Sequence, residues 1–304
     1  MNSIKFSLLF PAFGADFFRV ENRIITDYKN ISGKKIKQAS EILGIDFGLD
    51  DFFLYDTPDD ELVSQYKAYI FSSIMTDILK NTIALAEYTT GYSMGIYAAL
   101  YFCQSIEFEE GLNLIKNAYE LIKNTIQKDE YGMGSIIGLE FNDITKIINN
   151  NSIDVEIINQ NNKLSFVISG KLDEVKLIVD KAKEEGALNT KVLPISAPYH
   201  SNFLKDAAKS FTEYLKGINI KDSKYKIISG HNQKVISQKN EIIDELSANI
   251  YTKHNWLATM NKLIDLKVNS FFECGAGKSL SKTAKFIEGD YKIYTIKNLN
   301  TLTP

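Results

Sequence analysis

The chain has 304 residues, of which 44% are apolar and 24% charged, and its formal net charge is −3 at pH 7. This composition is typical of a globular protein with a sizeable core, and the small negative charge favours neither nucleic acid nor an anionic membrane as a partner. The two cysteines, Cys103 and Cys274, lack metal-ligand spacing, so we expect neither a metal site nor a disulfide framework. No stretch reaches the roughly 18 apolar residues of a membrane span, and Pro11 and Gly14 interrupt the first apolar run too early for a signal peptide. We therefore expect a cytoplasmic protein.

The first part of the chain alternates expected strands and helices. Residues 4–10 form a mainly apolar run before a loop with proline and glycine, which predicts a buried strand. Apolar residues recur at helical spacing over 64–79, so a buried helix is expected there. A short strand is predicted over 85–90, with a helix starting at Ser93, and three- and four-residue steps predict an amphipathic helix over 108–126.

The pattern changes near residue 130. Six segments within residues 129–197 follow the order strand, helix, strand, strand, helix, strand, which is the order of a ferredoxin-like unit. Alternation then resumes, with a helix over 202–215, strands within 223–230, 268–277 and 291–298, and a helix over 278–287. Such alternation argues for a parallel sheet covered on both faces. We predict an α/β fold with a parallel-sheet, hydrolase-like large domain (residues 1–128 and 198–304) and an inserted ferredoxin-like small subdomain (residues 129–197).

The segment GYSMG, residues 91–95, makes Ser93 a candidate nucleophile. In the pattern G-x-S-x-G, the glycines relieve crowding at a sharp turn between a strand and a helix. The turn lifts the serine oxygen clear of the backbone and places the next N–H where an oxyanion would form. The alternative interpretation is a glycine turn with a passive serine.

A nucleophilic serine needs a base, and the chain has three histidines. His200 follows an expected strand and a proline-bearing turn, which places it at the carboxyl end of a strand, where active sites of parallel sheets collect. We therefore favour His200 as the base. His231 is interpreted as a loop residue, and His254, among polar neighbours near a helix start, is expected to face solvent.

Four segments in order carry a resemblance to a family: FPAFG (10–14), GYSMG (91–95), SAPYHSNFL (196–204) and FECGAGKSL (272–280). Together they resemble the malonyl-CoA:acyl-carrier-protein transacylase family, which includes acyltransferases and acyl hydrolases of polyketide synthases. The resemblance spans nearly the whole chain, and the ferredoxin-like insertion falls where that family has one.

The resemblance implies roles for five residues. Ser93 would accept the acyl group, His200 would be its base, and the backbone carbonyl of Asn249 would orient the histidine. The N–H groups of Phe13 and Met94 would form the oxyanion hole. The implied reaction is ping-pong transfer between thiols of CoA and an acyl carrier protein, without metal or cofactor, by a monomer.

The sequence departs from the family around the nucleophile. Where the family reads FPGQG, this chain has Ala12 and Phe13, and the histidine that usually precedes the serine is Tyr92. With Ala118 and Tyr199, Tyr92 is expected at the acyl pocket. Asn159 and Asn161 match asparagines that line the family's cleft, although a role in a turn is an equal alternative.

The largest departure concerns a carboxylate-binding arginine. Malonyl-type members place it about 25 residues beyond the serine, where its fork of donors grips the free carboxylate of the malonyl group. Ala118 stands at that place, and the chain's two arginines lie far away, at positions 19 and 23. Lys116 is roughly 200° around the helix from Ala118, and Lys123 is equally ill placed.

These observations favour an acyltransferase for acyl groups without a free carboxylate. Three alternatives remain: a hydrolase that clears acyl groups from the carrier proteins of a polyketide assembly line, a malonyl transacylase that uses another cation, and a non-catalytic module that docks carrier proteins. The cations considered for the second are Lys67 and Lys205.

Overall fold

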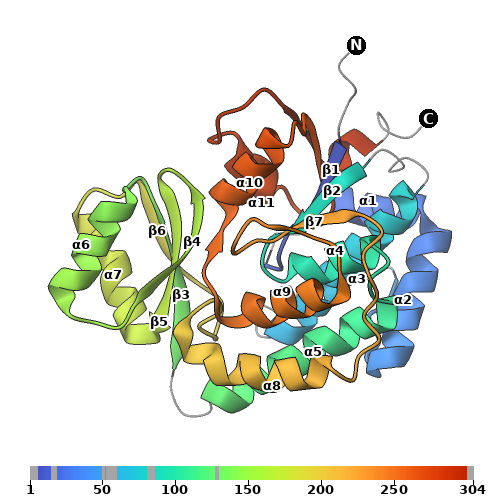
Figure 1. The fold of residues 1–304 in the computed structure, drawn as a ribbon, viewed down its shortest axis with the longest axis horizontal. Coiled ribbons are helices and arrows are strands. Elements are labelled where there is room, and N and C mark those ends of the chain that lie inside the picture. The colour runs from blue at the N-terminus through green and yellow to red at the C-terminus, as the bar shows by residue number, and fades with distance from the viewer. Residues whose placement is uncertain are drawn as a thin grey trace.

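The computed structural model describes residues 6–14, 19–49, 52, 60–80, 86–126 and 130–299. Residues 4 and 5 of the first expected strand and residue 85 of the second lie outside these ranges. Two sheets and the helices packed on them make up the fold (Figure 1).

The larger sheet has six strands in the order β11-β10-β1-β2-β7-β8. Neighbouring strands are parallel except for β7 and β8, which pair antiparallel, so the predicted parallel sheet is confirmed. The strands are β1 (Phe6–Phe10), β2 (Ala86–Gly91), β7 (Lys226–Ile228), β8 (Val235–Ile236), β10 (Ser270–Glu273) and β11 (Lys292–Tyr294). The last expected strand is shorter than the sequence indicated, because a 3₁₀ turn (Ile296–Asn298) follows it.

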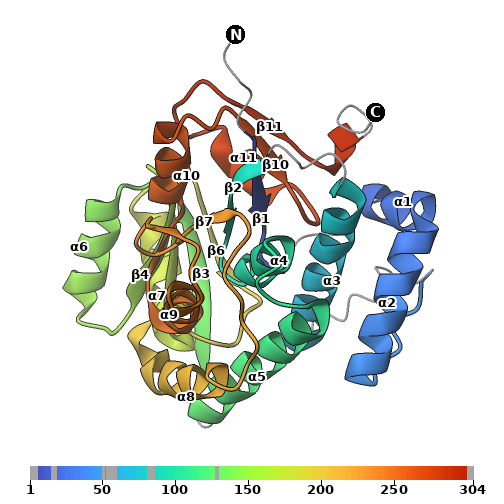
Figure 2. The same cartoon turned by 45° about the vertical axis from the view of Figure 1, so that its right-hand side comes forward.

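Helices cover both faces of the large sheet. Along β1, Leu8 and Phe10 point into a core shared with α2, α3, α4 and α5, while Leu9 points into a second core with Trp256 of α10. This alternation is expected for a strand whose two faces are both buried. The helices of the large domain are α1 (Arg19–Asp27), α2 (Lys29–Leu43), α3 (Glu61–Leu79), α4 (Gly95–Phe102), α5 (Phe108–Ile126), α8 (Lys205–Leu215), α9 (Lys239–Tyr251), α10 (Trp256–Asp265) and α11 (Ser279–Ala284). Helix α4 contacts β1, β2, α3 and α5 and lies among them (Figure 2).

The inserted unit forms the smaller sheet, in the order β6-β3-β5-β4-β9. Its elements are β3 (Tyr131–Ile137), α6 (Phe141–Asn151), β4 (Glu156–Asn162), β5 (Ser165–Lys171), α7 (Leu172–Glu184) and β6 (Asn189–Leu193). The order of its four antiparallel strands confirms the ferredoxin-like unit. The domain boundaries at residues 129 and 197 stay a prediction.

The two faces of the small sheet have different environments. Helices α6 and α7 cover the face that points away from the large domain (Figure 1). On the other face, Met133, Ile158 and Val167 pack with Tyr199. A short strand of the large domain, β9 (His254–Asn255), extends this sheet by pairing parallel to β4, with Asn159 opposite His254. Among the described residues, no helix combines the length and apolarity needed to cross a membrane.

Candidate active site

Ser93 occupies a strained turn between β2 and α4. Its φ is 54°, in the left-handed region that serine rarely adopts, at a cost of about 1–3 kcal/mol. The flanking glycines are required by backbone contacts. A Cβ on Gly91 would lie 2.1 Å from the Ile96 nitrogen, and one on Gly95 would lie 2.2 Å from the Phe10 oxygen. The turn therefore has the geometry that G-x-S-x-G predicts.

His200 lies directly against the serine. The Ser93 Oγ and the His200 Nε2 are 2.7 Å apart, and the imidazole is only 4% exposed. His200 also has a left-handed backbone, with φ 60°, and its N–H donates to the Ile250 carbonyl over 2.9 Å. The structure thus brings together the two residues that the sequence paired as nucleophile and base.

Burial keeps the His200 ring neutral. Desolvation lowers its pKa to about 4, a shift that the carbonyls of Asn249 and Thr252 oppose and the charge of His231 reinforces. The His200 Nδ1 makes no hydrogen bond of standard geometry with any described residue, so orientation of the ring by the Asn249 carbonyl stays a prediction. A neutral Nε2 beside a hydroxyl can accept its proton.

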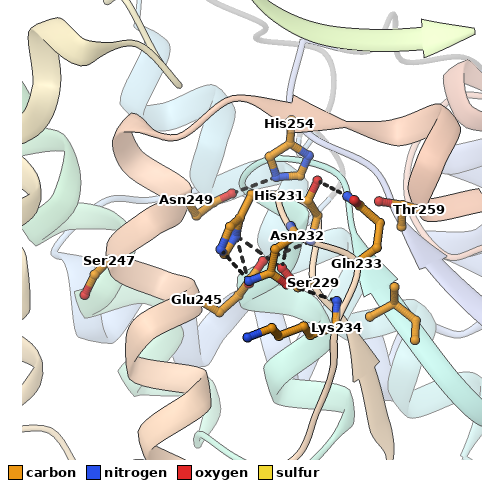
Figure 3. A network of polar contacts seen from close by, with 12 residues as sticks. Ser229, His231, Asn232, Gln233, Lys234, Glu245, Ser247, Asn249, His254 and Thr259 are labelled. Atoms are coloured by element: carbon orange, nitrogen blue, oxygen red, sulfur yellow. Dashed lines mark hydrogen bonds and ion pairs between the residues drawn. The ribbon is translucent and has the colours of Figure 1, made fainter. Parts of the chain in front are cut away.

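The expectation that His254 faces solvent is wrong. His254 is buried, and its Nε2 lies 3.0 Å from the Asn249 Oδ1 (Figure 3). Its ring centroid is 4.9 Å from that of His200. Polar neighbours in sequence suggested exposure, but pairing of β9 with β4 turns the side chain inward. The ring packs on the backbone at Gly230, where a Cβ would lie 2.1 Å from the His254 Cε1.

His231 lies in the turn between β7 and β8, as interpreted. Its Nδ1 is 3.0 Å from the Glu245 Oε2, and the other carboxylate oxygen accepts from the Gly230 N–H (Figure 3). The contacts that the structure shows for this ring tie it to the loop and to α9.

The expected oxyanion donors flank the serine. Phe13 and Met94 line the same cavity as Ser93, and Met94 is the residue before the first turn of α4. Within the described part of the chain, neither backbone N–H donates to a protein acceptor. Both donors are therefore free, and the start of a helix favours negative charge at this place.

Two cavities adjoin Ser93 and His200. The first, which we name the α5-side cavity, has a volume of about 30 Å³ and is lined by Phe13, Gln65, Ser93, Met94, Tyr97, Ala118, Tyr119, Ile122, Tyr199, His200, Asn249 and Ile250. The second, the sheet-side cavity, has a volume of about 150 Å³ and is lined by Ala12, Phe13, Tyr92, Ser93, Met133, Ile158, Asn159, Val167, Leu193, Ile195, Tyr199 and His200. All three residues expected at the acyl pocket line one of them, and Tyr199 lines both.

Tyr92 joins the turn at Ser93 to the small sheet. Its hydroxyl donates to the Asn161 Oδ1 over 2.8 Å and accepts from the Asn159 Nδ2. Both asparagines lie on strand β4, so the alternative that they form a turn is wrong. The Tyr92 ring packs edge-on against Trp256, with centroids 5.4 Å apart, and burial raises the pKa of the phenol to about 12.

No arginine or lysine lines either cavity as the structure describes it. Ala118 is buried and faces the α5-side cavity, whereas Lys116, two residues earlier, is exposed. The Lys123 Nζ donates to the Ser196 Oγ over 2.6 Å. The other two lysines considered as substitutes lie outside the cavities: Lys67 is buried on α3, and Lys205 is exposed at the start of α8.

Glu61 is a residue of this region that sequence reasoning missed. It opens helix α3, and its Oε1 accepts a hydrogen bond from the Tyr199 hydroxyl over 2.6 Å. One turn later, the Gln65 Nε2 donates to the same hydroxyl over 3.0 Å. The sequence signal at Glu61, an acidic residue after the N-cap Asp60, indicates a helix start and says nothing of a distant cavity.

Known proteins resemble the chain over nearly its full length. No protein-family model matches it. The malonyl CoA-acyl carrier protein transacylase of Bacillus subtilis (strain 168) is 26% identical over 307 aligned residues, covering 98% of this chain and 95% of the relative. The crystal structure of FabD from Acinetobacter baumannii aligns with a TM-score of 0.88 at 25% identity, covering 98% of each chain. A malonyl-transacylase solved in complex with the acyl-carrier protein of a type II polyketide synthase has a TM-score of 0.90, 21% identity and the same coverage of both chains.

Proposed function

Because the chain belongs to the malonyl-CoA:acyl-carrier-protein transacylase family, we propose that it is a serine acyltransferase that moves an acyl group between CoA and carrier-protein thioesters. The observation that carries this proposal is the 2.7 Å contact between the Ser93 Oγ and the His200 Nε2 at a strained turn. The related transacylase bound to an acyl-carrier protein supports such a protein as one partner, with an acyl-CoA as the other.

The proposed reaction has two half-reactions that share one acyl-enzyme. His200 takes the Ser93 proton while the oxygen attacks the thioester carbonyl, and the N–H groups of Phe13 and Met94 stabilise the oxyanion. The protonated His200 then gives that proton to the leaving thiolate, which leaves an ester on Ser93. A second thiol loses its proton to His200 and attacks the ester, and His200 returns that proton to the departing Ser93 oxygen, which restores the serine. The steps need no cofactor, and we expect a monomer to perform them.

The environment of the base supports transfer over hydrolysis. His200 is 4% exposed, and Asn249, whose carbonyl we propose orients the ring, is buried beside it. A water molecule that attacked the acyl-enzyme would have to reach the buried His200. We propose that the thiol of a carrier protein or CoA reaches it on its flexible arm and occupies the space beside Ser93. We therefore propose that the acyl-enzyme persists until a thiol arrives.

We further propose that the acyl group carries no free carboxylate. The α5-side cavity has Ala118 where the resemblance places an arginine, and no cation lines it as described. A carboxylate buried there without a cation would cost several kcal/mol. The sheet-side cavity presents mainly apolar side chains, among them Met133, Ile158 and Val167, which suit an uncharged acyl chain.

Intact-protein mass spectrometry after brief incubation with acetyl-, butyryl- and malonyl-CoA tests the proposal. We expect an acetyl or butyryl adduct that is absent from Ser93→Ala and disappears when a carrier protein with a free pantetheine thiol is added. An adduct that decays in buffer alone would establish the hydrolase. Preferential malonylation would contradict the assignment of the acyl group, and no adduct with any thioester would contradict catalysis through Ser93.

A further inference from the structure

Glu61 places a negative charge directly behind the wall of the acyl site. The side chain is 9% exposed, and its two oxygens accept three hydrogen bonds. The donors are the Tyr199 hydroxyl at 2.6 Å, the Ser196 hydroxyl at 2.8 Å and the Ser196 N–H at 3.2 Å. Among the described residues, every hydrogen bond to this carboxylate comes from a neutral donor, so no described cation binds it directly.

Only one side chain separates that charge from the site of acyl transfer. Tyr199 binds Glu61 through its hydroxyl and lines both cavities beside Ser93. Burial, and next the charge of Glu61, raise the pKa of Tyr199 well above its usual value, so the phenol stays a neutral donor. Burial, and next the charges of Glu61 and Asp60, raise the pKa of Tyr119, another residue of the α5-side cavity. Glu61 thus lies in hydrogen-bond contact with Tyr199, which lines this cavity.

Lys123 is connected to Glu61 only through Ser196 in the contacts that the structure shows. The Lys123 Nζ donates to the Ser196 Oγ, and that hydroxyl donates in turn to Glu61. The lysine therefore lies beyond Ser196 and does not line the α5-side cavity. An acyl carboxylate in the cavity would meet the Tyr199 hydroxyl, which already donates to Glu61, and would lie close to a like charge.

We propose that Glu61 is a specificity-determining residue, whose charge behind Tyr199 excludes acyl groups that end in a carboxylate from the site at Ser93. The inference rests on the proposed acyl transfer through Ser93. This proposal goes beyond the absence of a cation at Ala118, because the negative charge of Glu61 would repel the carboxylate of the acyl group. Like charges a few ångströms apart in a site closed to water disfavour each other strongly.

The test compares two acyl groups of the same length that differ in charge. Malonyl-CoA and acetoacetyl-CoA are each mixed with the full chain, and the rate of Ser93 acylation is followed by intact-protein mass spectrometry. Wild type is expected to react faster with acetoacetyl-CoA. Glu61→Gln should raise the malonyl-to-acetoacetyl rate ratio at least tenfold. The matched control is Glu213→Gln, which removes an exposed charge from α8 and should change the ratio less than twofold.

A second variant separates charge from packing. Tyr199→Phe breaks the hydrogen bond to Glu61 but leaves its charge, so the ratio should stay at or below the wild-type value. The inference is overturned if Glu61→Gln leaves the ratio unchanged, if Tyr199→Phe raises it as much, or if wild type prefers malonyl-CoA. If neither thioester acylates wild type, the proposed function itself fails, and that result is distinct from an unchanged ratio.

Discussion

The rings of His200 and His254 lie with their centroids 4.9 Å apart and their planes inclined by 53°, and both are buried. Two ionisable rings this close in a site closed to water cannot both carry charge at moderate cost. Desolvation lowers the pKa of both, and the charge of His200 lowers that of His254 further. The surroundings of His200, the proposed base, therefore keep the ring in its proton-accepting form.

This arrangement predicts the acid limb of the pH–rate profile. Because the pKa of His200 is lowered to about 4, the ring stays unprotonated at pH values where an exposed histidine is already charged. We expect kcat/KM for acylation to fall only as the pH approaches about 4, as measured by single-turnover acylation across the acidic range. An acid limb at the ordinary histidine value would show that the ring is more hydrated than its burial indicates.

The same shifts make stability depend on pH. The unfolded chain binds a proton at His200 near its ordinary pKa, whereas the folded chain does so only near pH 4, so stability is lost as the pH falls below about 6.5. His200 alone should lower the unfolding free energy by about 3 kcal/mol over that interval. Urea unfolding at several pH values measures this loss. His254→Phe should make it smaller, and an equal loss in this variant would contradict a contribution from His254.

The turn at Ser93 should not tolerate a methyl group at Gly95. A Cβ there would lie 2.2 Å from the backbone oxygen of Phe10, and neither backbone can move without displacing β1 or α4. We expect Gly95→Ala to lower stability by more than about 2 kcal/mol and to abolish acylation of Ser93. Gly217→Ala is the control, because its nearest contact would be 3.6 Å, and it should change both by little. Thermal unfolding and mass spectrometry report the two effects.

Tyr92 should matter mainly through its hydroxyl. Tyr92→Phe keeps the packing against Trp256 but leaves the amides of Asn159 and Asn161 without the phenol. Unpaired buried polar groups cost about 1–3 kcal/mol, so a loss of that size is expected in urea unfolding. Tyr294→Phe, which alters a half-buried tyrosine stacked on Phe6, should cost less. If both variants lose the same unfolding free energy, the Tyr92 hydroxyl does not anchor the turn at Ser93 to the small sheet.

Local patterns predicted much of the fold. The amphipathic helix over residues 108–126 and the six elements of the inserted unit appear in the structure because their spacing alone fixes one buried face. The sequence patterns do not predict helices α1, α2 and α9. Helix α9 packs against α8, which precedes it by about 30 residues. The burial of α9 therefore depends on a distant partner, and the local sequence does not reveal it.

The candidate site also contains some residues that local sequence motifs predict and others that they do not. Ser93 and His200 are found within short motifs whose geometry is local. Glu61 is not, because its importance comes from Tyr199, which is 138 positions further along the chain. His254 was misjudged for a similar reason, since the strand that turns it inward forms only when β4 of the inserted unit lies beside it.

Strand β9 has a mechanical consequence for substrate entry. It belongs to the large domain by chain order, yet it pairs with β4 and sets Asn159 beside His254. Swinging the inserted unit outward would break this pairing or pull His254 away from the base. The pairing of β9 with β4 therefore connects the large domain to the inserted unit beside His200. If this pairing persists, Phe13 and Tyr199, which line both cavities at Ser93, are side chains that an entering substrate has to displace.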